Sequence, residues 1–175
     1  MPIGFYDKII IADTSCFIAF DNIGSLGILQ AICPAIITTP EVAVEYGKVL
    51  PEWIQIMPVK DIAKIKTINT FLGMGESSAI ALAIEMEKSI VILDDKKARR
   101  YAQDIGLDII GIIGLLRLGY KQGLIPEIDT IIARLKKIGF RMPVNIEELM
   151  KGINTAGQAL HPAPDGAFRG RAAGY

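Results

Sequence analysis

The chain has 175 residues, of which 51% are hydrophobic and 22% charged. This fits one soluble α/β domain with a real core, because a chain of about 150 residues buries roughly two thirds of its unfolded surface. Lys plus Arg and Asp plus Glu number 19 each, so net charge gives no support for tight nonspecific binding of nucleic acid. Any site for a polyanion must therefore be local.

The cysteine pattern and the start of the chain indicate a reduced, cytoplasmic protein. Cys16 and Cys33 lack metal-ligand spacing, and the first residues show no secretory leader pattern. No uncharged apolar run approaches the roughly 20 residues needed to span a bilayer. The longest candidate, residues 105–118, is interrupted by glycines and charges, so we expect no membrane role.

Residues 8–13 are rich in isoleucine without polar alternation, which predicts a strand buried on both faces and ending at Asp13. Thr14 and Ser15 then supply a cap for the helix that follows. Asp13 lies at this strand-to-helix turn and has two interpretations. It either belongs to a site of chemistry or merely caps the helix, since Asp is a preferred cap residue.

A second short strand is predicted within residues 33–38, followed by a helix start. Thr39 can cap this helix and Pro40 suits its first position. Glu41 faces the positive end of the helix dipole, which explains it structurally. Glu45 lies one turn further along the same side, where the dipole gives it much less. Taken alone, Glu45 is most simply a solvated surface residue.

Residues 53–59 predict a third short strand, and residues 61–72 predict an amphipathic helix. Its apolar stripe consists of Ile62, Ile65, Ile68, Phe71 and Leu72.

The run Gly73-Met74-Gly75-Glu76 predicts a glycine turn before a small-residue helix that has Glu76 in its first turn. Glu76 in a first helical turn gains about 0.3–1 kcal/mol from the dipole. Two glycines exceed what a cap needs, and they let the backbone approach another group closely. A phosphate cradle is disfavoured, because no Gly-Lys-Ser/Thr follows.

Residues 90–93 form the clearest buried strand, and Asp94 and Asp95 follow it directly. Two adjacent aspartates cannot both cap the next helix well, so we expect one of them to face a cation. That helix opens with a basic cluster, which is either a solvated face or a contact for nucleic-acid phosphates. The cluster consists of Lys96, Lys97, Arg99 and Arg100.

The C-terminal third predicts one more strand at residues 107–110 and helices near residues 111–123, 126–138 and 143–149. After Gly152 the composition shifts to Gly, Ala, Pro and scattered Arg. We therefore predict a folded domain over residues 1–151 and a disordered tail or engineered remnant over residues 152–175. The sole histidine, His161, lies in that tail and is given no catalytic weight.

Acidic residues follow several of the predicted strands and helix starts. Because ligands bind beyond the carboxyl ends of strands in a parallel α/β sheet, we expect three to five carboxylates to converge there. Like charges this close raise each other's pKa unless a cation intervenes, and all-oxygen ligands suit Mg²⁺ or Mn²⁺. Without an active-site His, a Cys–His pair or a zinc cluster, metal-assisted phosphodiester hydrolysis is favoured. The candidate ligands are Asp13, Glu45, Glu76, Asp94 and Asp95.

At these residues the sequence resembles the PIN domain, the Rossmann-like ribonuclease fold of VapC-like toxins. The resemblance extends over residues 9–149 and rests on the order and spacing of several motifs. Residues 106–125 are similar to a largely uncharacterised prokaryotic branch of those proteins. The motifs are residues 11–15, the Thr-Pro-x-x-Ala-x-Glu helix at 39–45, residues 73–79 and residues 93–99.

The resemblance implies a parallel central sheet of four to five strands flanked by helices. It places the family's acids on Asp13, Glu45, Glu76 and either Asp95 or Asp94, and these would be catalytic or hold the metal. Thr14 or Ser15 matches the hydroxyl residue common near the first acid. It also implies cleavage of single-stranded RNA with Mg²⁺ or Mn²⁺, a homodimer, and often inhibition by a small antitoxin. The alternative is a PIN-like module that binds RNA or a protein without cutting.

Overall fold

The computed structural model describes residues 8–151. The chain divides into two compact units after Val144, and the described part of the second unit is α9 (Ile146–Lys151). The tail predicted for residues 152–175, with His161, lies outside the described residues, and the domain boundary at residue 151 stays a prediction. The features below belong to the first unit.

The centre of the first unit is a five-stranded sheet in which all neighbouring strands are parallel. This confirms the α/β class and the predicted strand number. Its strands in sequence order are β1 (Ile9–Ala12), β2 (Ile36–Thr38), β3 (Ile54–Ile56), β4 (Ser89–Ile92) and β5 (Asp108–Ile110).

The strand order β3-β2-β1-β4-β5 indicates where in the sheet a ligand site is expected. The chain runs outward from β1 to β3 on one side, then crosses back to β4 on the other side of β1. Ile11 pairs with Ile37 of β2 and with Val91 of β4. The direction of winding therefore reverses between β1 and β4, and ligands of open α/β sheets bind beyond such a switch point.

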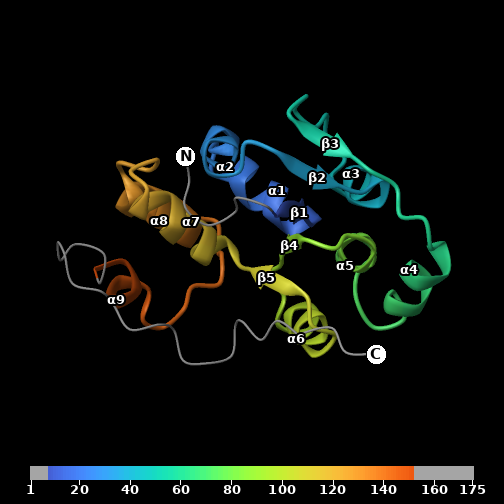
Figure 1. Ribbon diagram of the computed structural model, residues 1–175. Coiled ribbons are helices and arrows are strands. Elements are labelled where there is room, and N and C mark those ends of the chain that lie inside the picture. Colours follow the sequence, from blue (N-terminus) through green and yellow to red (C-terminus); the bar gives the residue numbers. More distant parts are fainter. Residues whose placement is uncertain (1–7, 152–175) are drawn as a thin grey trace. The chain divides into compact units, whose positions relative to one another are not determined.

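Helices cover both faces of this sheet. Figure 1 shows α4, α5 and α6 on one side of the strands and α2, α7 and α8 on the other. The helices of the first unit are α1 (Thr14–Asn22), α2 (Leu26–Ile32), α3 (Pro40–Tyr46), α4 (Ile62–Ile68), α5 (Met74–Glu85), α6 (Lys96–Asp104), α7 (Ile112–Lys121) and α8 (Ile128–Lys137). Among these helices, as over the rest of residues 8–151, none is long and apolar enough to cross a membrane.

Helix α5 lies against the middle of the sheet because its side chains there are small. Residues 79–83, in which alanines alternate with Ile80 and Leu82, are fully buried and pack with Ile11, Val91 and, just after β4, Leu93. The helix starts at Met74 with Gly73 as its N-cap, and Glu76 lies in its first turn as predicted. The glycine run belongs to this first turn and does not form a separate turn before the helix. The glycines therefore bring the helix start, and not a turn, close to neighbouring groups.

Helix α4 is shorter than the predicted amphipathic helix, because it ends at Ile68. Ile65, Ile68 and Leu72 are buried as predicted, whereas Ile62 and Phe71 are 50% and 38% exposed. Residues 69–72 form a turn and not a continuation of the helix, and Phe71 no longer belongs to the buried stripe.

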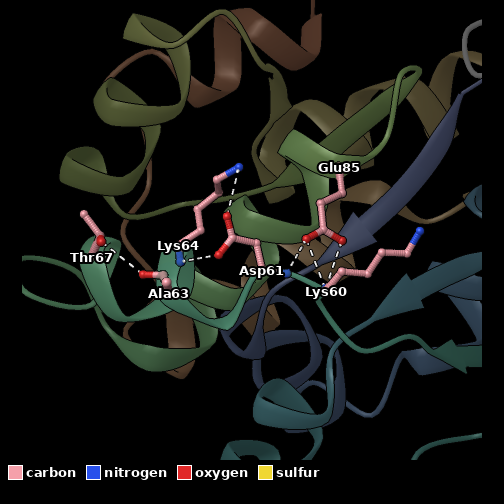
Figure 2. Close-up of polar contacts among 6 residues, drawn as sticks. All are labelled: Lys60, Asp61, Ala63, Lys64, Thr67 and Glu85. Carbon is pink, nitrogen blue, oxygen red and sulfur yellow. Dashed lines mark hydrogen bonds and ion pairs between the residues drawn. The ribbon is translucent and has the colours of Figure 1, made fainter.

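Polar contacts fix the start of α4 to the end of α5 (Figure 2). The Glu85 carboxylate accepts hydrogen bonds from the backbone amides of Lys60 and Asp61, at 2.8–3.1 Å. Asp61 in turn caps α4 by accepting from the Lys64 amide at 3.1 Å. Since the chain then returns to Gly73 at the other end of α5, the 69–73 turn lies near the start of α5.

Candidate active site

Asp13 directly follows β1 and combines both functions considered for it. Its Oδ1 accepts a hydrogen bond from the Cys16 amide at 2.9 Å, so it caps α1. The side chain is 1% exposed, and within residues 8–151 its Oδ2 is a buried atom without a hydrogen-bond partner. Asp13, and not Thr14 or Ser15 as predicted, is therefore the cap of α1, and it uses only one of its two oxygens for this.

Burial raises the pKa of Asp13 to about 8, against an ordinary value of 3.8. The hydrogen bond from Cys16 opposes this shift, and the negative charges of Asp94, Glu76 and Glu45 add to it. A carboxylate in this environment is stabilised by whatever brings positive charge to it, either a proton or a cation.

Glu76 lies in the first turn of α5 and faces the same region. Its Oε2 accepts from the Gly73 amide at 3.2 Å. Burial raises the pKa of Glu76, the Gly73 hydrogen bond lowers it, and the charges of Asp95 and Glu45 raise it further. Charges on three separate helices therefore act on one another here.

Glu45, on α3, is tied to the start of α5. Its Oε2 accepts from the Gly75 amide at 2.8 Å. A Cβ atom at Gly75 would lie 2.8 Å from that oxygen and would also overlap the Thr14 hydroxyl. The second glycine of the run is therefore required by close approach to α1 and α3, which is the kind of contact the sequence suggested.

Asp94 and Asp95 each accept backbone amides at a helix start, but at two different helices. Asp95 caps α6, accepting from Lys97 and Ala98 at 2.8 and 3.0 Å. Asp94 accepts from the Ile112 amide, the first residue of α7, at 3.1 and 3.2 Å. Asp95 alone is therefore the N-cap of the next helix, as expected, whereas Asp94 contacts the first amide of α7, whose N-cap is Gly111.

The pKa of Asp94 is also raised by burial, and the Ile112 hydrogen bond and the Arg99 charge both lower it. The negative charge of the Asp94 carboxylate is thus partly compensated by the Ile112 amide and by Arg99. Its negative charge nevertheless contributes to the raised pKa of Asp13.

One pocket, of about 350 Å³, brings four of the five predicted acids together. Asp13, Glu45, Glu76 and Asp95 line it, and the predicted hydroxyl residues Thr14 and Ser15 do so as well. Asp94 is not among the lining residues identified within the described chain. The pocket therefore lies beyond the carboxyl ends of β1 and β4, at the switch point of the sheet.

The four predicted basic residues differ in their surroundings. Lys97 lines the pocket and Lys96 is exposed. Arg99 donates to the Leu93 carbonyl at 2.9 Å and is partly buried, while Arg100 lies 3.9 Å from Asp104 in an exposed pair. Of the cluster, Lys97 is the residue that the structure places at the acidic pocket.

The chemistry of the donors fits a hard divalent cation bound by few direct ligands. Within residues 8–151 no group of three or more His, Cys, Asp or Glu side chains is placed to hold a metal ion. Mg²⁺, however, usually keeps several waters and binds through one or two carboxylates and substrate phosphate. Asp13 Oδ2, and the Thr14 Oγ1 that is also buried without a partner among these residues, are oxygens of the kind such an ion uses.

Several supporting residues were missed from the sequence. A chain of buried hydroxyls joins the strand ends to α5: Thr39 and Ser78 hydrogen-bond at 2.7 Å, and Thr38 donates to the Ala12 carbonyl at 2.9 Å. Ser78 also donates to the Gly75 carbonyl at 3.0 Å. Serines and threonines at helix starts read as ordinary caps, so no pattern in the sequence indicated this link between α3 and α5.

Comparison with known protein families decides which family has this arrangement. A family model described as PIN domain matches residues 9–153, which is most of the chain. The chain belongs to the PIN-domain family. PIN domains are in general metal-dependent nucleases, so membership supports a nuclease role at this acidic pocket. No curated protein and no solved structure matches the chain.

Proposed function

We propose that this PIN domain is an endoribonuclease that hydrolyses phosphodiesters of single-stranded RNA with Mg²⁺ or Mn²⁺. The observation that carries the proposal is the buried Asp13 carboxylate, whose Oδ2 has no partner within the described residues and whose pKa is raised to about 8 beside three other acids. Burying an uncompensated carboxylate is costly, which is typical of a ligand-binding or catalytic group and not of a simple cap.

Each acid has a proposed role derived from its contacts. Asp13 would hold the cation through Oδ2, because Oδ1 is used by the Cys16 amide. Asp95 and Glu76 line the same pocket and would bind the ion directly or through its waters. Asp94, which is not identified as lining the pocket, would act through its negative charge on Asp13. When bound, a divalent cation would lower the pKa of a water molecule and stabilise the negative charge that develops at the phosphodiester.

The remaining residues would position the substrate. Glu45 is held by the Gly75 amide and can orient a water or accept its proton from a fixed place. The hydroxyls of Thr14 and Ser15 can donate to a phosphate oxygen, and Lys97 at the pocket can neutralise a neighbouring phosphate. Lys96 and Arg100 would contact further phosphates of the RNA strand. Arg99 would mainly hold Leu93 and Asp94 in place.

The biological setting that we propose follows from the resemblance to VapC-like toxins. The protein would act in the cytoplasm as a homodimer and as the toxin of a toxin–antitoxin pair, inhibited by a small antitoxin. A small reading frame adjacent to the gene, whose product binds this protein and blocks cleavage, would support this setting.

A non-cleaving PIN-like module that binds RNA or a protein is the second candidate. The observation in its favour is that the described residues lack a cluster of three or more carboxylates placed to hold a metal. On this alternative, RNA would bind at Lys97 and its neighbours without being cut.

The test is cleavage of a labelled single-stranded RNA by the full chain with Mn²⁺ or Mg²⁺, compared with Asp13→Asn. The matched control is Asp104→Asn, which changes an exposed aspartate of α6 and is purified identically. We expect the wild type and the control to cut and Asp13→Asn to be inactive. Equal cleavage by all three would indicate a contaminating nuclease, and binding without cleavage by the wild type would favour the second candidate.

A further inference from the structure

Phe71 is an aromatic side chain on the wall of the acidic pocket. It lines the pocket together with Lys97 and the four carboxylates, and it is 38% exposed. Its sequence neighbour Leu72 is 8% exposed and occupies the core position. Leu72, and not Phe71, therefore fills the core, and the Phe71 ring lies at the pocket of the predicted reaction centre.

The backbone holds this ring in a fixed place. The Phe71 and Leu72 amides both donate to the Ile68 carbonyl, at 3.2 and 3.1 Å. Leu72 is anchored in the hydrophobic core, and the start of α4 is tied to α5 through Glu85 (Figure 2). The backbone that carries the ring is therefore ordered before a ligand binds.

Tyr101 supports the ring from α6, the helix that also carries Lys97. The two ring centroids are 4.9 Å apart and the rings are inclined at 68°, an edge-to-face geometry that aromatic pairs prefer. Tyr101 itself packs against the core. The supported ring thus lines the same pocket as Lys97, a cation that can contact phosphate.

The ligand that suits this combination is a flat, uncharged ring attached to a phosphate. Base–aromatic stacking contributes to single-strand binding with little dependence on sequence, since every base has a π-face. Bases in a duplex have no free face for such a ring. A cationic side chain of a partner protein is the competing ligand for this ring, and the peptide measurement described below separates it from a base.

We propose that Phe71 stacks on an unpaired nucleobase next to the phosphodiester held in the acidic pocket, an assignment that rests on the proposed nuclease function. Phe71 is then the residue that makes the site selective for single strands. Lys97 contacts the phosphate of the same nucleotide or its neighbour.

The test measures binding and not cleavage, so it does not depend on turnover. The Kd of a fluorescent oligoribonucleotide is measured by anisotropy with Ca²⁺, another hard cation with oxygen ligands, for the wild-type parent, Phe71→Leu and Phe71→Tyr. Asp13 is left intact, because its carboxylate is proposed to hold the cation. Leu retains an apolar contact with Tyr101 but has no π-face, whereas Tyr retains the ring. The matched control is Ile62→Ala, which removes an exposed apolar side chain of α4 that is not identified as lining the pocket.

We expect Phe71→Leu to raise the Kd by roughly 5- to 100-fold, the range of one base stack. Phe71→Tyr and Ile62→Ala should stay within about twofold of the parent, and the same pattern should hold for an oligodeoxynucleotide because the ring contacts the base and not the 2′-hydroxyl. One abasic nucleotide at the stacked position should raise the Kd of the parent for the oligonucleotide and leave the Kd of Phe71→Leu unchanged.

Three results would overturn the assignment in distinguishable ways. Binding by the parent that is unchanged in Phe71→Leu overturns the stacking role alone. Absence of binding by the parent overturns the proposed function together with the stacking role. A Phe71→Leu effect on an arginine-rich peptide that exceeds the effect on the oligonucleotide would assign the ring to a cationic partner side chain instead.

Discussion

Replacing Asp13 by Asn should stabilise the protein in the absence of divalent metal while it removes nuclease activity. In the folded chain the pKa of Asp13 is raised to about 8 from its ordinary value of 3.8, chiefly by burial. Asn is as good a helix cap as Asp, so the hydrogen bond from the Cys16 amide to Oδ1 can be retained. The substitution therefore removes the charge and keeps the cap.

The sign and size of the effect follow from proton linkage. Because the folded pKa lies above the unfolded pKa, the native state keeps a proton that the unfolded chain has lost between about pH 4 and pH 8. The unfolding free energy of the wild type therefore falls as pH rises through that window. At pH 7 the cost has an upper limit on the order of 4 kcal/mol, and below pH 4 it vanishes.

The assay is urea unfolding of wild type and Asp13→Asn in EDTA at several pH values. The stability difference should favour Asp13→Asn, grow as pH rises from 4 to 8, and reach about 2–4 kcal/mol, since the new buried amide offsets part of the gain. Asp61→Asn is the control, because Asp61 also caps a helix through its side chain but is exposed. The reasoning is refuted if Asp13→Asn is less stable than the wild type at pH 8 without metal.

Four further outcomes follow from the same contacts. Adding Mn²⁺ at about 100 times its Kd should stabilise the wild type by roughly 2.7 kcal/mol and Asp13→Asn by much less, as thermal unfolding with and without EDTA will show. Gly75→Ala should displace Glu45 or Thr14, cost about 1–3 kcal/mol in urea unfolding, and lower RNA cleavage. Ser78→Ala breaks the buried hydroxyl link to Thr39 and should cost about 1–2 kcal/mol with a smaller effect on cleavage, measured in the same two assays. Glu85→Ala removes the acceptor at the far end of α5 and should cost about 1 kcal/mol, with cleavage by the folded protein unchanged.

The sequence predicted those parts of the fold that depend on local patterns. Isoleucine runs without alternation located β1 and β4, and the Thr39–Pro40 pair located the start of α3 within one residue. The same patterns placed Asp13 and Asp95 after their strands, because residues that follow parallel strands share one edge of the sheet.

The sequence could not predict contacts that depend on distant segments. The partner of Asp94 is the amide of Ile112, which is 18 positions away and becomes a neighbour only when β5 pairs with β4. Phe71 fits the apolar stripe of a continuous helix, but α4 ends at Ile68, and the turn that follows directs the ring to the pocket. In both cases tertiary packing overrode a reasonable local interpretation.

The five acids share a structural feature that explains how they coexist at one sheet edge. Each accepts a backbone N–H from the first turn of a helix: Asp13 from α1, Glu45 from α5, Asp95 from α6 and Asp94 from α7, and Glu76 from the N-cap of α5. Such amides and the positive ends of the helix dipoles stabilise negative charge. They compensate part of the mutual repulsion and hold the acids in place before any ligand arrives.

This compensation is incomplete at one atom, and that atom decides between a structural and a functional interpretation of the cluster. If the acids were only caps, each buried oxygen would be expected to have a donor, since buried polar groups are nearly always hydrogen-bonded. Asp13 Oδ2 is buried and has no donor among residues 8–151, and the pKa of its carboxyl is raised to about 8. Capping therefore explains where the acids are, but it does not explain the free oxygen of Asp13, whose charge either a proton or the proposed cation would compensate.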